Sequence, residues 1–113
     1  MVKRFLEQNR PPGCPECSGI MKHATVSFGQ SLPADVLQES IELAQQADVF
    51  FAMGSSLVVY PAANLPRLAK QSGGRLVIIN RDPTPHDEFA DAVINASVGE
   101  TLTTIDDYLK GLV

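Results

Sequence analysis

Continuous apolar runs along the chain predict short buried strands. Residues 49–53 are apolar throughout and end at Gly54, and residues 76–79 form a second run that ends at Asn80. Runs of this kind are typical of strands covered on both faces, as in a parallel sheet. Residues 91–96 form a weaker third run, and residues 24–28 form a short run with β-branched side chains. The pattern therefore predicts four strands.

Apolar residues at helical spacing predict helices between and after these runs. Residues 33–47 begin with a proline and place apolar residues at helical intervals. Residues 61–71 also begin with a proline and are followed by two glycines, the usual asymmetry of helix ends. A last helix starts near residue 99. This alternation of strands and helices predicts an α/β fold built as a three-layer sandwich.

Composition narrows the possible functions. The chain has 113 residues, enough for one domain, and a net charge of −4. An acidic chain lacks the basic face that nucleic acid binding requires. No segment approaches the roughly 18 apolar residues of a membrane-spanning helix. We therefore expect no nucleic acid and no membrane as partner. Because two cysteines make a secreted disulfide framework improbable, we expect a cytoplasmic protein.

Two predicted strands end in residues that could bind a nucleotide. Gly54 would let the backbone approach a ligand closely, and Ser55 and Ser56 offer hydroxyls and amides to a phosphate or ribose oxygen. Asn80 could bind ribose hydroxyls. The two ends support each other, because ligands of such sheets bind at the carboxyl ends of the strands. The structural alternatives are a plain turn after Gly54 and an Asx turn before Pro83.

The Cys14-Pro15-Glu16-Cys17 segment has three interpretations. The favoured one is half of a Cys₄ zinc site, since two thiolates from one tight turn supply two corners of a tetrahedron. The others are a redox dithiol and no function. The redox motif requires a strand before it and a helix starting at it, which the surrounding prolines and glycines do not suggest. His23 could serve as a further ligand, although a surface position suits it better.

No catalytic group emerges from spacing alone. His23 and His86 are the only histidines, and neither lies in a predicted site. The acidic pairs at residues 87–88 and 106–107 are interpreted as solvated charges of a loop and a helix.

Across residues 11–110 the chain resembles the sirtuin family of NAD-dependent protein deacylases. The resemblance is carried by four motifs in the family's order: residues 14–22, similar to the second half of the sirtuin zinc ribbon; residues 25–33, similar to Val-x-Phe-Gly-Glu-x-Leu-Pro; residues 54–62, similar to Gly-(Thr/Ser)-Ser-Leu-x-Val-x-Pro; and residues 78–84, similar to Ile-Asn-x-x-x-Thr.

The resemblance implies roles for particular residues. It implies a Rossmann-like sheet with helices on both faces, NAD as cofactor, zinc at a half-site, and an acyl-lysine protein or peptide as substrate. The NAD ribose and phosphate would contact Gly54, Ser55, Ser56 and Asn80, and the adenine would contact Ser97 and Val98. The peptide would pair as a strand with residues around Val26, Phe28, Gly29, Val58 and Val59. The zinc ligands would be Cys14 and Cys17.

The chain also departs from the family pattern. It contains no Gly-Ala-Gly-x-Ser loop, no Thr-Gln-Asn-x-Asp segment, no residue that matches the catalytic His, and no first Cys pair. We therefore expect the C-terminal part of a deacylase, inactive as this chain alone. Residues 1–23 would be a partial zinc ribbon and residues 24–113 a partial NAD-binding domain. The first five residues resemble the interior of a helix.

Two further functions stay open at this point. The chain could be a non-catalytic module that binds a nucleotide or oligomerises, with a missing N-terminal half or a second copy of itself as partner. Pairing would use an exposed sheet edge. It could also be a redox or metal-carrier protein that uses its two cysteines.

Overall fold

The computed structural model describes residues 10–112 of the 113. The first five residues, with their helix-like pattern, therefore lie outside the described residues. The chain divides into two compact units, Met1–Leu32 and Pro33–Val113, which we call the N-terminal and C-terminal units.

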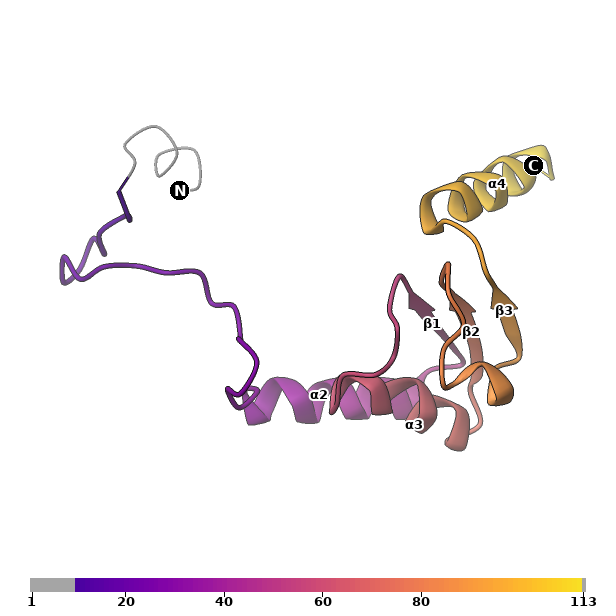
Figure 1. Cartoon of the computed structure of the whole chain (residues 1–113), viewed down its shortest axis with the longest axis horizontal. Helices are drawn as coiled ribbons and strands as arrows, with labels where there is room; N and C mark the ends of the chain where they lie inside the picture. Colours follow the sequence, from indigo (N-terminus) through magenta and orange to yellow (C-terminus); the bar gives the residue numbers. More distant parts are fainter. Residues whose placement is uncertain (1–9, 113) are drawn as a thin grey trace. The chain divides into compact units, whose positions relative to one another are not determined.

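The C-terminal unit contains the predicted alternation of helices and strands (Figure 1). Its elements are α2 (Ala34–Gln46), β1 (Val49–Met53), the 3₁₀ turn η1 (Ala62–Asn64), α3 (Leu65–Gln71), β2 (Arg75–Ile79), the 3₁₀ turn η2 (Asp87–Phe89), β3 (Ala92–Ile94) and α4 (Val98–Gly111). The predicted helix over residues 61–71 is confirmed, but it opens as a 3₁₀ turn. Within that turn Asn64 N–H bonds the Pro61 carbonyl.

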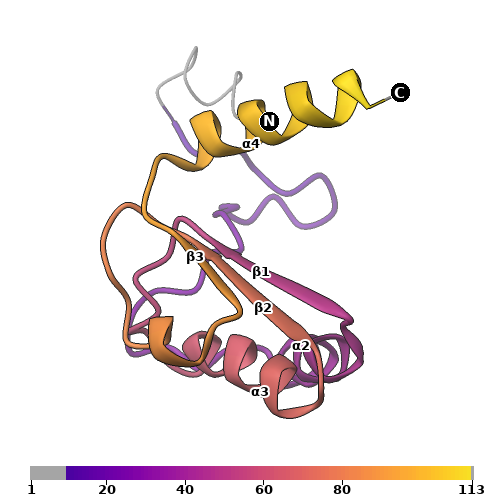
Figure 2. The ribbon, with the colours of Figure 1, turned by 90° about the vertical axis from the view of Figure 1, so that its right-hand side faces the viewer.

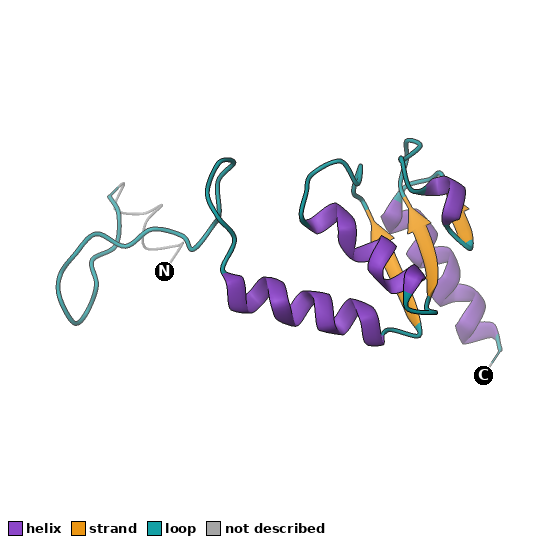
Figure 3. Cartoon of the chain, turned by 90° about the horizontal axis from the view of Figure 1, so that it is seen from below, coloured by secondary structure: helices purple, strands orange, loops and turns teal. Residues whose placement is uncertain are grey.

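The three strands form one parallel sheet in the order β1-β2-β3. Figures 2 and 3 show α2 and α3 on one side of the sheet and α4 on the other. The α3 helix packs on β1 and β2, and α2 packs on α3. The predicted α/β fold with a parallel sheet is thus confirmed. Within the described part of the chain, no helix is long and apolar enough to cross a bilayer.

The core lies between the sheet and α3. Leu76 and Ile78 of β2 are fully buried there together with Ala52, Leu57 and Ala63. Burial of a leucine or isoleucine side chain contributes about 1.5–3 kcal/mol of folding free energy. This small cluster therefore contributes much of the free energy that holds the sheet against the helices.

The other face of β1 is largely uncovered. Val49, Phe51 and Met53 are 46%, 52% and 44% exposed. The prediction that residues 49–53 are covered on both faces is therefore wrong for the described structure. Side chains alternate along a strand, so one face of β1 meets α3 while the other needs a second layer. The apolar side chains of α4 that could supply this layer, such as Leu102 and Leu109, are themselves exposed.

A polar contact fixes the start of β3 beside β2. Lys70 Nζ lies 2.8 Å from both carboxylate oxygens of Asp91. The same carboxylate accepts a hydrogen bond from Leu76 N–H, also at 2.8 Å. The hydrogen bond from Lys70, and next that from Leu76 N–H, lowers the pKa of Asp91 below its usual range.

The N-terminal unit has little regular structure in its described residues. An isolated antiparallel bridge joins Gly13 to Ile20 around the two cysteines. Residues 24–28 are not a strand, so that prediction is wrong. A strand requires a partner for its backbone groups, and the described residues offer none to this segment.

Candidate functional site

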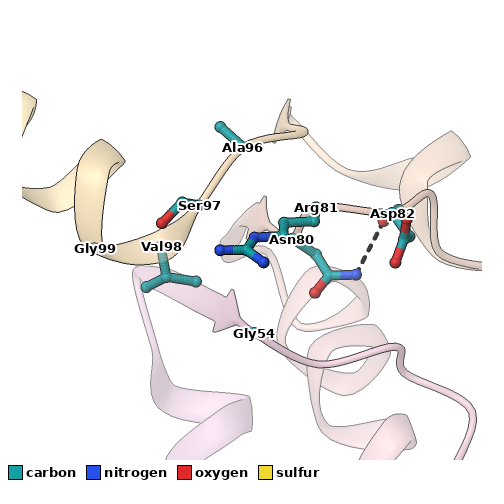
Figure 4. Close-up of a pocket in the computed structure, with 8 residues that line it drawn as sticks. All are labelled: Gly54, Asn80, Arg81, Asp82, Ala96, Ser97, Val98 and Gly99. Carbon is teal, nitrogen blue, oxygen red and sulfur yellow. Dashed lines mark hydrogen bonds between the residues drawn. The ribbon is translucent and has the colours of Figure 1, made fainter.

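A pocket of about 390 Å³ lies where the chain leaves the carboxyl ends of the strands (Figure 4). Gly54 follows β1, Asn80 follows β2, and the connection from β3 to α4 closes the opposite side. The lining residues are Gly54, Asn80, Arg81, Asp82, Ala96, Ser97, Val98 and Gly99. The structure therefore brings four of the six predicted nucleotide-binding residues into one cavity: Gly54, Asn80, Ser97 and Val98.

Gly54 keeps one wall of the pocket open. Its φ of +64° lies in the left-handed region that favours glycine. A Cβ at this position would lie 3.7 Å from Cγ2 of Val98, which faces it across the cavity. Gly54 N–H bonds the Ile79 carbonyl at 2.9 Å, so the sheet itself fixes this wall.

Asn80 fits both interpretations of its role, as a residue that forms a turn and as a residue that binds ribose hydroxyls. Its side-chain N–H donates to the Asp82 carbonyl at 2.9 Å, which forms the local turn. The amide oxygen points away from Asp82 (Figure 4). Asn95 supports the same segment by donating to the Asn80 carbonyl at 3.1 Å. The side chain is thus held in one orientation and keeps an acceptor for a ligand hydroxyl.

The N-terminus of α4 forms the other wall. Ser97 caps this helix, since its hydroxyl accepts from Glu100 N–H at 3.5 Å. The first amides of a helix have no partner inside the helix, and its dipole favours negative charge there. Arg81 adds a cation to the same cavity. The Asp82 carboxylate lines the cavity too, and Arg81 offsets its charge, so the helix amides suit an anionic ligand such as a phosphate.

Sequence reasoning missed Arg81. Its position directly after Asn80 at a strand end was the available signal, because neighbouring residues of a strand-end loop share its pocket.

Ser55 and Ser56 are not among the residues that line the pocket. The hydroxyl of Ser55 accepts a hydrogen bond from Leu57 N–H at 3.2 Å. Leu57 has a positive φ of 55° and a buried side chain. Ser55 therefore stabilises a tight turn, as the structural alternative for this segment supposed.

The residues predicted to contact a peptide belong to both units. Val58 and Val59 are exposed in the loop after β1, in the C-terminal unit. In the N-terminal unit Val26 is exposed and Phe28 is 92% exposed. Gly29 follows in the left-handed region, with φ +85°. The apolar side chains of Val26, Phe28, Val58 and Val59 are thus exposed to solvent.

The two cysteines lie in a tight turn with free thiols. Cys14 N–H bonds the Gly19 carbonyl at 2.8 Å, and Ser18 N–H bonds the Cys14 carbonyl at 2.9 Å. Hydrogen bonds from the backbone of Cys17, then of Glu16, lower the pKa of the Cys14 thiol. These bonds favour the thiolate of Cys14, the form that binds zinc, and the turn fits two of the four corners of a tetrahedral site.

No third ligand approaches these thiols among residues 10–112, where no cluster of three or more His, Cys, Asp or Glu residues could hold a metal ion. His23 is exposed, in agreement with the surface position predicted for it.

His86 lies outside the pocket, as the sequence predicts, but it is buried. Its side chain is 1% exposed, and its Nε2 lies 2.6 Å from the Ala63 carbonyl oxygen. Neither His86 nor His23 lines the pocket.

A parallel sheet with a pocket at its carboxyl ends, closed by a capped helix N-terminus, defines a Rossmann-like α/β protein. The Sir2 family model matches residues 1–61 of the chain. The NAD-dependent protein deacetylase of Rhodopseudomonas palustris is 55% identical over 98 residues, which cover 87% of this chain and 39% of that protein. NAD-dependent protein deacetylase 1 of Bradyrhizobium diazoefficiens is 50% identical over 101 residues, which cover 89% of this chain and 40% of that protein.

A solved structure agrees with these relatives. A Sir2 protein with a p53 peptide and NAD⁺ has a TM-score of 0.80 and 39% identity, over 98% of this chain and 46% of that one. The chain belongs to the Sir2 family. It spans about two fifths of the length of the curated relatives that it matches.

Proposed function

We propose that this chain is the C-terminal part of an NAD-dependent protein deacylase and that it binds NAD and acyl-lysine peptide. The observation that carries the proposal is the pocket at the strand ends, which joins the Asn80 oxygen, the Arg81 cation and the N-terminus of α4. The names of the relatives, and the NAD⁺ and peptide in the similar structure, support it.

Each wall of the pocket suits a different part of NAD. The Asn80 oxygen accepts from a ribose hydroxyl, and the open wall at Gly54 admits the sugar. Ser97 and Val98, at the start of α4, would contact the adenine. The first amides of α4 and the Arg81 cation would favour the negative diphosphate. Ser55 shapes the turn after Gly54, and Ser55 and Ser56 would contact the ligand through their backbone amides or hydroxyls. When bound, NAD supplies the activated ribose to which the acyl group is transferred.

The peptide would bind by strand addition. Val58 and Val59 lie in an exposed loop, and Val26, Phe28 and Gly29 lie in an exposed segment for which residues 10–112 offer no strand partner. Such backbone can pair with an extended peptide, and its apolar side chains can contact the acyl-lysine stem.

We further propose that the chain alone does not turn over substrate. A general base must reach the reacting ribose within hydrogen-bond distance. His86 is buried and its Nε2 is engaged by Ala63, and His23 does not line the pocket. The alternative of a non-catalytic nucleotide-binding module is favoured by the same observation.

Cys14 and Cys17 would bind zinc as half of a zinc ribbon within residues 1–23. Because a structural zinc needs four ligands, the other two would come from an N-terminal half of the protein or from a second copy. The free thiols suit a reducing compartment, and we propose the cytoplasm.

The test is calorimetric titration of the chain with NAD. We expect binding by the wild type and at least about tenfold weaker binding by Asn80→Ala, a loss of about 1.4 kcal/mol. Asn64→Ala is the matched control, since Asn64 is exposed and does not line the pocket. A folded wild-type chain that binds no NAD at millimolar concentration would refute the proposal. Nicotinamide release from NAD and an acetyl-lysine peptide by the pure chain would refute the proposed inactivity.

A further inference from the structure

The connection between β2 and β3 lacks the helix that usually joins parallel strands. Residues 80–91 contain only the short turn η2, Asp87–Phe89. A parallel crossover normally places a helix against the sheet, and the hydrogen bonds of that helix fix its shape. Here the same segment carries Asn80, Arg81 and Asp82 of the pocket. Some other interaction must therefore hold it in place.

Local hydrogen bonds give the connection its shape. The Asp87 carboxylate accepts from Thr84 Oγ1 at 2.6 Å and from Thr84 N–H at 3.0 Å. Thr84 Oγ1 in turn accepts from His86 N–H at 3.3 Å. These bonds span two or three residues, so they fold the turn but do not fasten it to the rest of the unit.

Long-range bonds hold both ends of the connection, through Asn95 at Asn80 and Lys70 at Asp91. His86 ties its middle. Its Nε2 meets the Ala63 carbonyl oxygen at 2.6 Å, between residues 23 positions apart. A carbonyl only accepts, so Nε2 carries the hydrogen. The other ring nitrogen, Nδ1, is buried and has no partner in the described structure. A hydrogen there would be buried without an acceptor, which disfavours it. His86 therefore donates to Ala63 through a hydrogen on Nε2.

Aromatic and cation–π contacts reinforce this hydrogen bond. The His86 and Phe89 rings lie 5.0 Å apart, and the Arg67 guanidinium lies 5.3 Å from the Phe89 ring centre. Phe89 packs against the core cluster that contains Ala63. These contacts join the β2–β3 connection to η1 and α3. Both elements follow Gly54 in the sequence.

We propose that His86 is a positioning residue for the nucleotide pocket. The sheet already holds Gly54 and Asn80 through the Ile79 and Ile94 carbonyls. Through Ala63, His86 fastens the middle of the loop that follows Asn80, so that Arg81 and Asp82 keep a fixed position in the pocket. The expected effect of His86 on NAD affinity rests on the proposed function of the pocket. Its expected effect on amide exchange in the loop does not depend on that function.

Two substitutions separate the hydrogen bond from the packing. His86→Leu keeps an apolar side chain of similar size but removes the donor. His86→Gln returns an N–H near the position of Nε2. Ala69→Gly is the control, because Ala69 is buried in α3 and the change weakens a helix without touching either loop.

The first readout is amide hydrogen exchange without ligand. The amides of Thr84 and Asp87 are hydrogen-bonded within the loop and report on it, and those of α2 report on the whole unit. We expect His86→Leu to speed exchange at the two loop amides about tenfold relative to α2. His86→Gln should restore it, and Ala69→Gly should raise exchange at all sites alike.

The second readout is the dissociation constant for NAD. His86→Leu should raise it about tenfold, and His86→Gln should remain within about threefold of the wild type. Wild-type exchange at the loop amides in His86→Leu, or an equal rise at loop and α2, overturns the proposal. If the wild type binds no NAD, the proposed function fails, and the exchange pattern alone still decides the role of His86.

Discussion

Replacing Gly54 by alanine separates backbone strain from loss of space in the pocket. With φ at +64°, an alanine there occupies the left-handed region, which costs about 1–2 kcal/mol. The new methyl would lie 3.7 Å from Val98 Cγ2, an ordinary contact, so no collision adds to this cost. For a domain of 60–100 residues, each kcal/mol lowers Tm by about 4–8 °C. We therefore expect a Tm about 4–16 °C lower.

The same methyl fills the gap between two pocket residues. Gly54 and Val98 both line the cavity, and a ligand must pass between or against them. We expect the affinity for NAD to fall at least about tenfold, equivalent to about 1.4 kcal/mol. This loss arises from occupied space and should persist at temperatures where the variant is fully folded.

Gly73→Ala is the matched control. Gly73 also has a positive φ, +96°, and a Cβ there would meet nothing within 4 Å. It follows α3 and is not among the pocket residues. Its φ lies further from the left-handed minimum, so its loss of stability should be at least as large as that of Gly54→Ala.

Thermal unfolding by circular dichroism and NAD titration at 15 °C measure the two effects on the same samples. We expect both variants to lose stability and only Gly54→Ala to lose affinity. Unchanged NAD affinity in folded Gly54→Ala, or equal losses of affinity in both variants, would refute the reasoning.

Three further predictions concern other parts of the chain. Gly74→Ala should destabilise the C-terminal unit by about 1–3 kcal/mol in urea unfolding, because its Cβ would collide with the Ala47 carbonyl oxygen; an unchanged midpoint would contradict this. The depressed pKa of Asp91 means that its stabilising contribution is present above the unfolded pKa near 3.9 and is lost as pH falls through the folded value. The difference in stability between wild type and Asp91→Asn should therefore be larger at pH 6 than at pH 2.5, and a difference independent of pH would speak against it. Zinc titration against a chromogenic chelator should give one zinc per two chains if two copies complete the site, whereas Cys14→Ser and Cys17→Ser should each abolish that binding; retention by both would exclude the thiols as ligands.

The strand-end rule predicted much of the pocket. Gly54 and Asn80 follow apolar runs long enough to identify as strands, and a parallel sheet brings such ends to one edge. Residues 76–79 were predicted as a buried strand because their pattern is local, and both Leu76 and Ile78 are buried as expected.

Other features depend on residues far away in the sequence. Residues 24–28 have a strand-like composition, but pairing requires a neighbouring strand that a local pattern does not reveal. The burial of His86 cannot be predicted from a local pattern, because its hydrogen-bond partner, Ala63, is 23 residues away. The exposed face of Phe51 likewise depends on whether a second layer packs there, which the apolar run itself does not specify.

The uncovered face of β1 has a thermodynamic consequence. Unfolding a domain raises its heat capacity by about 12–15 cal/mol/K per residue, mainly because apolar surface becomes hydrated. Val49, Phe51 and Met53 already meet water in the folded chain, so unfolding hydrates less new apolar surface. The heat-capacity increment and the denaturant m-value per residue should both be smaller than usual. The stability of this chain should consequently change little between cold and warm conditions, on a broad and shallow curve.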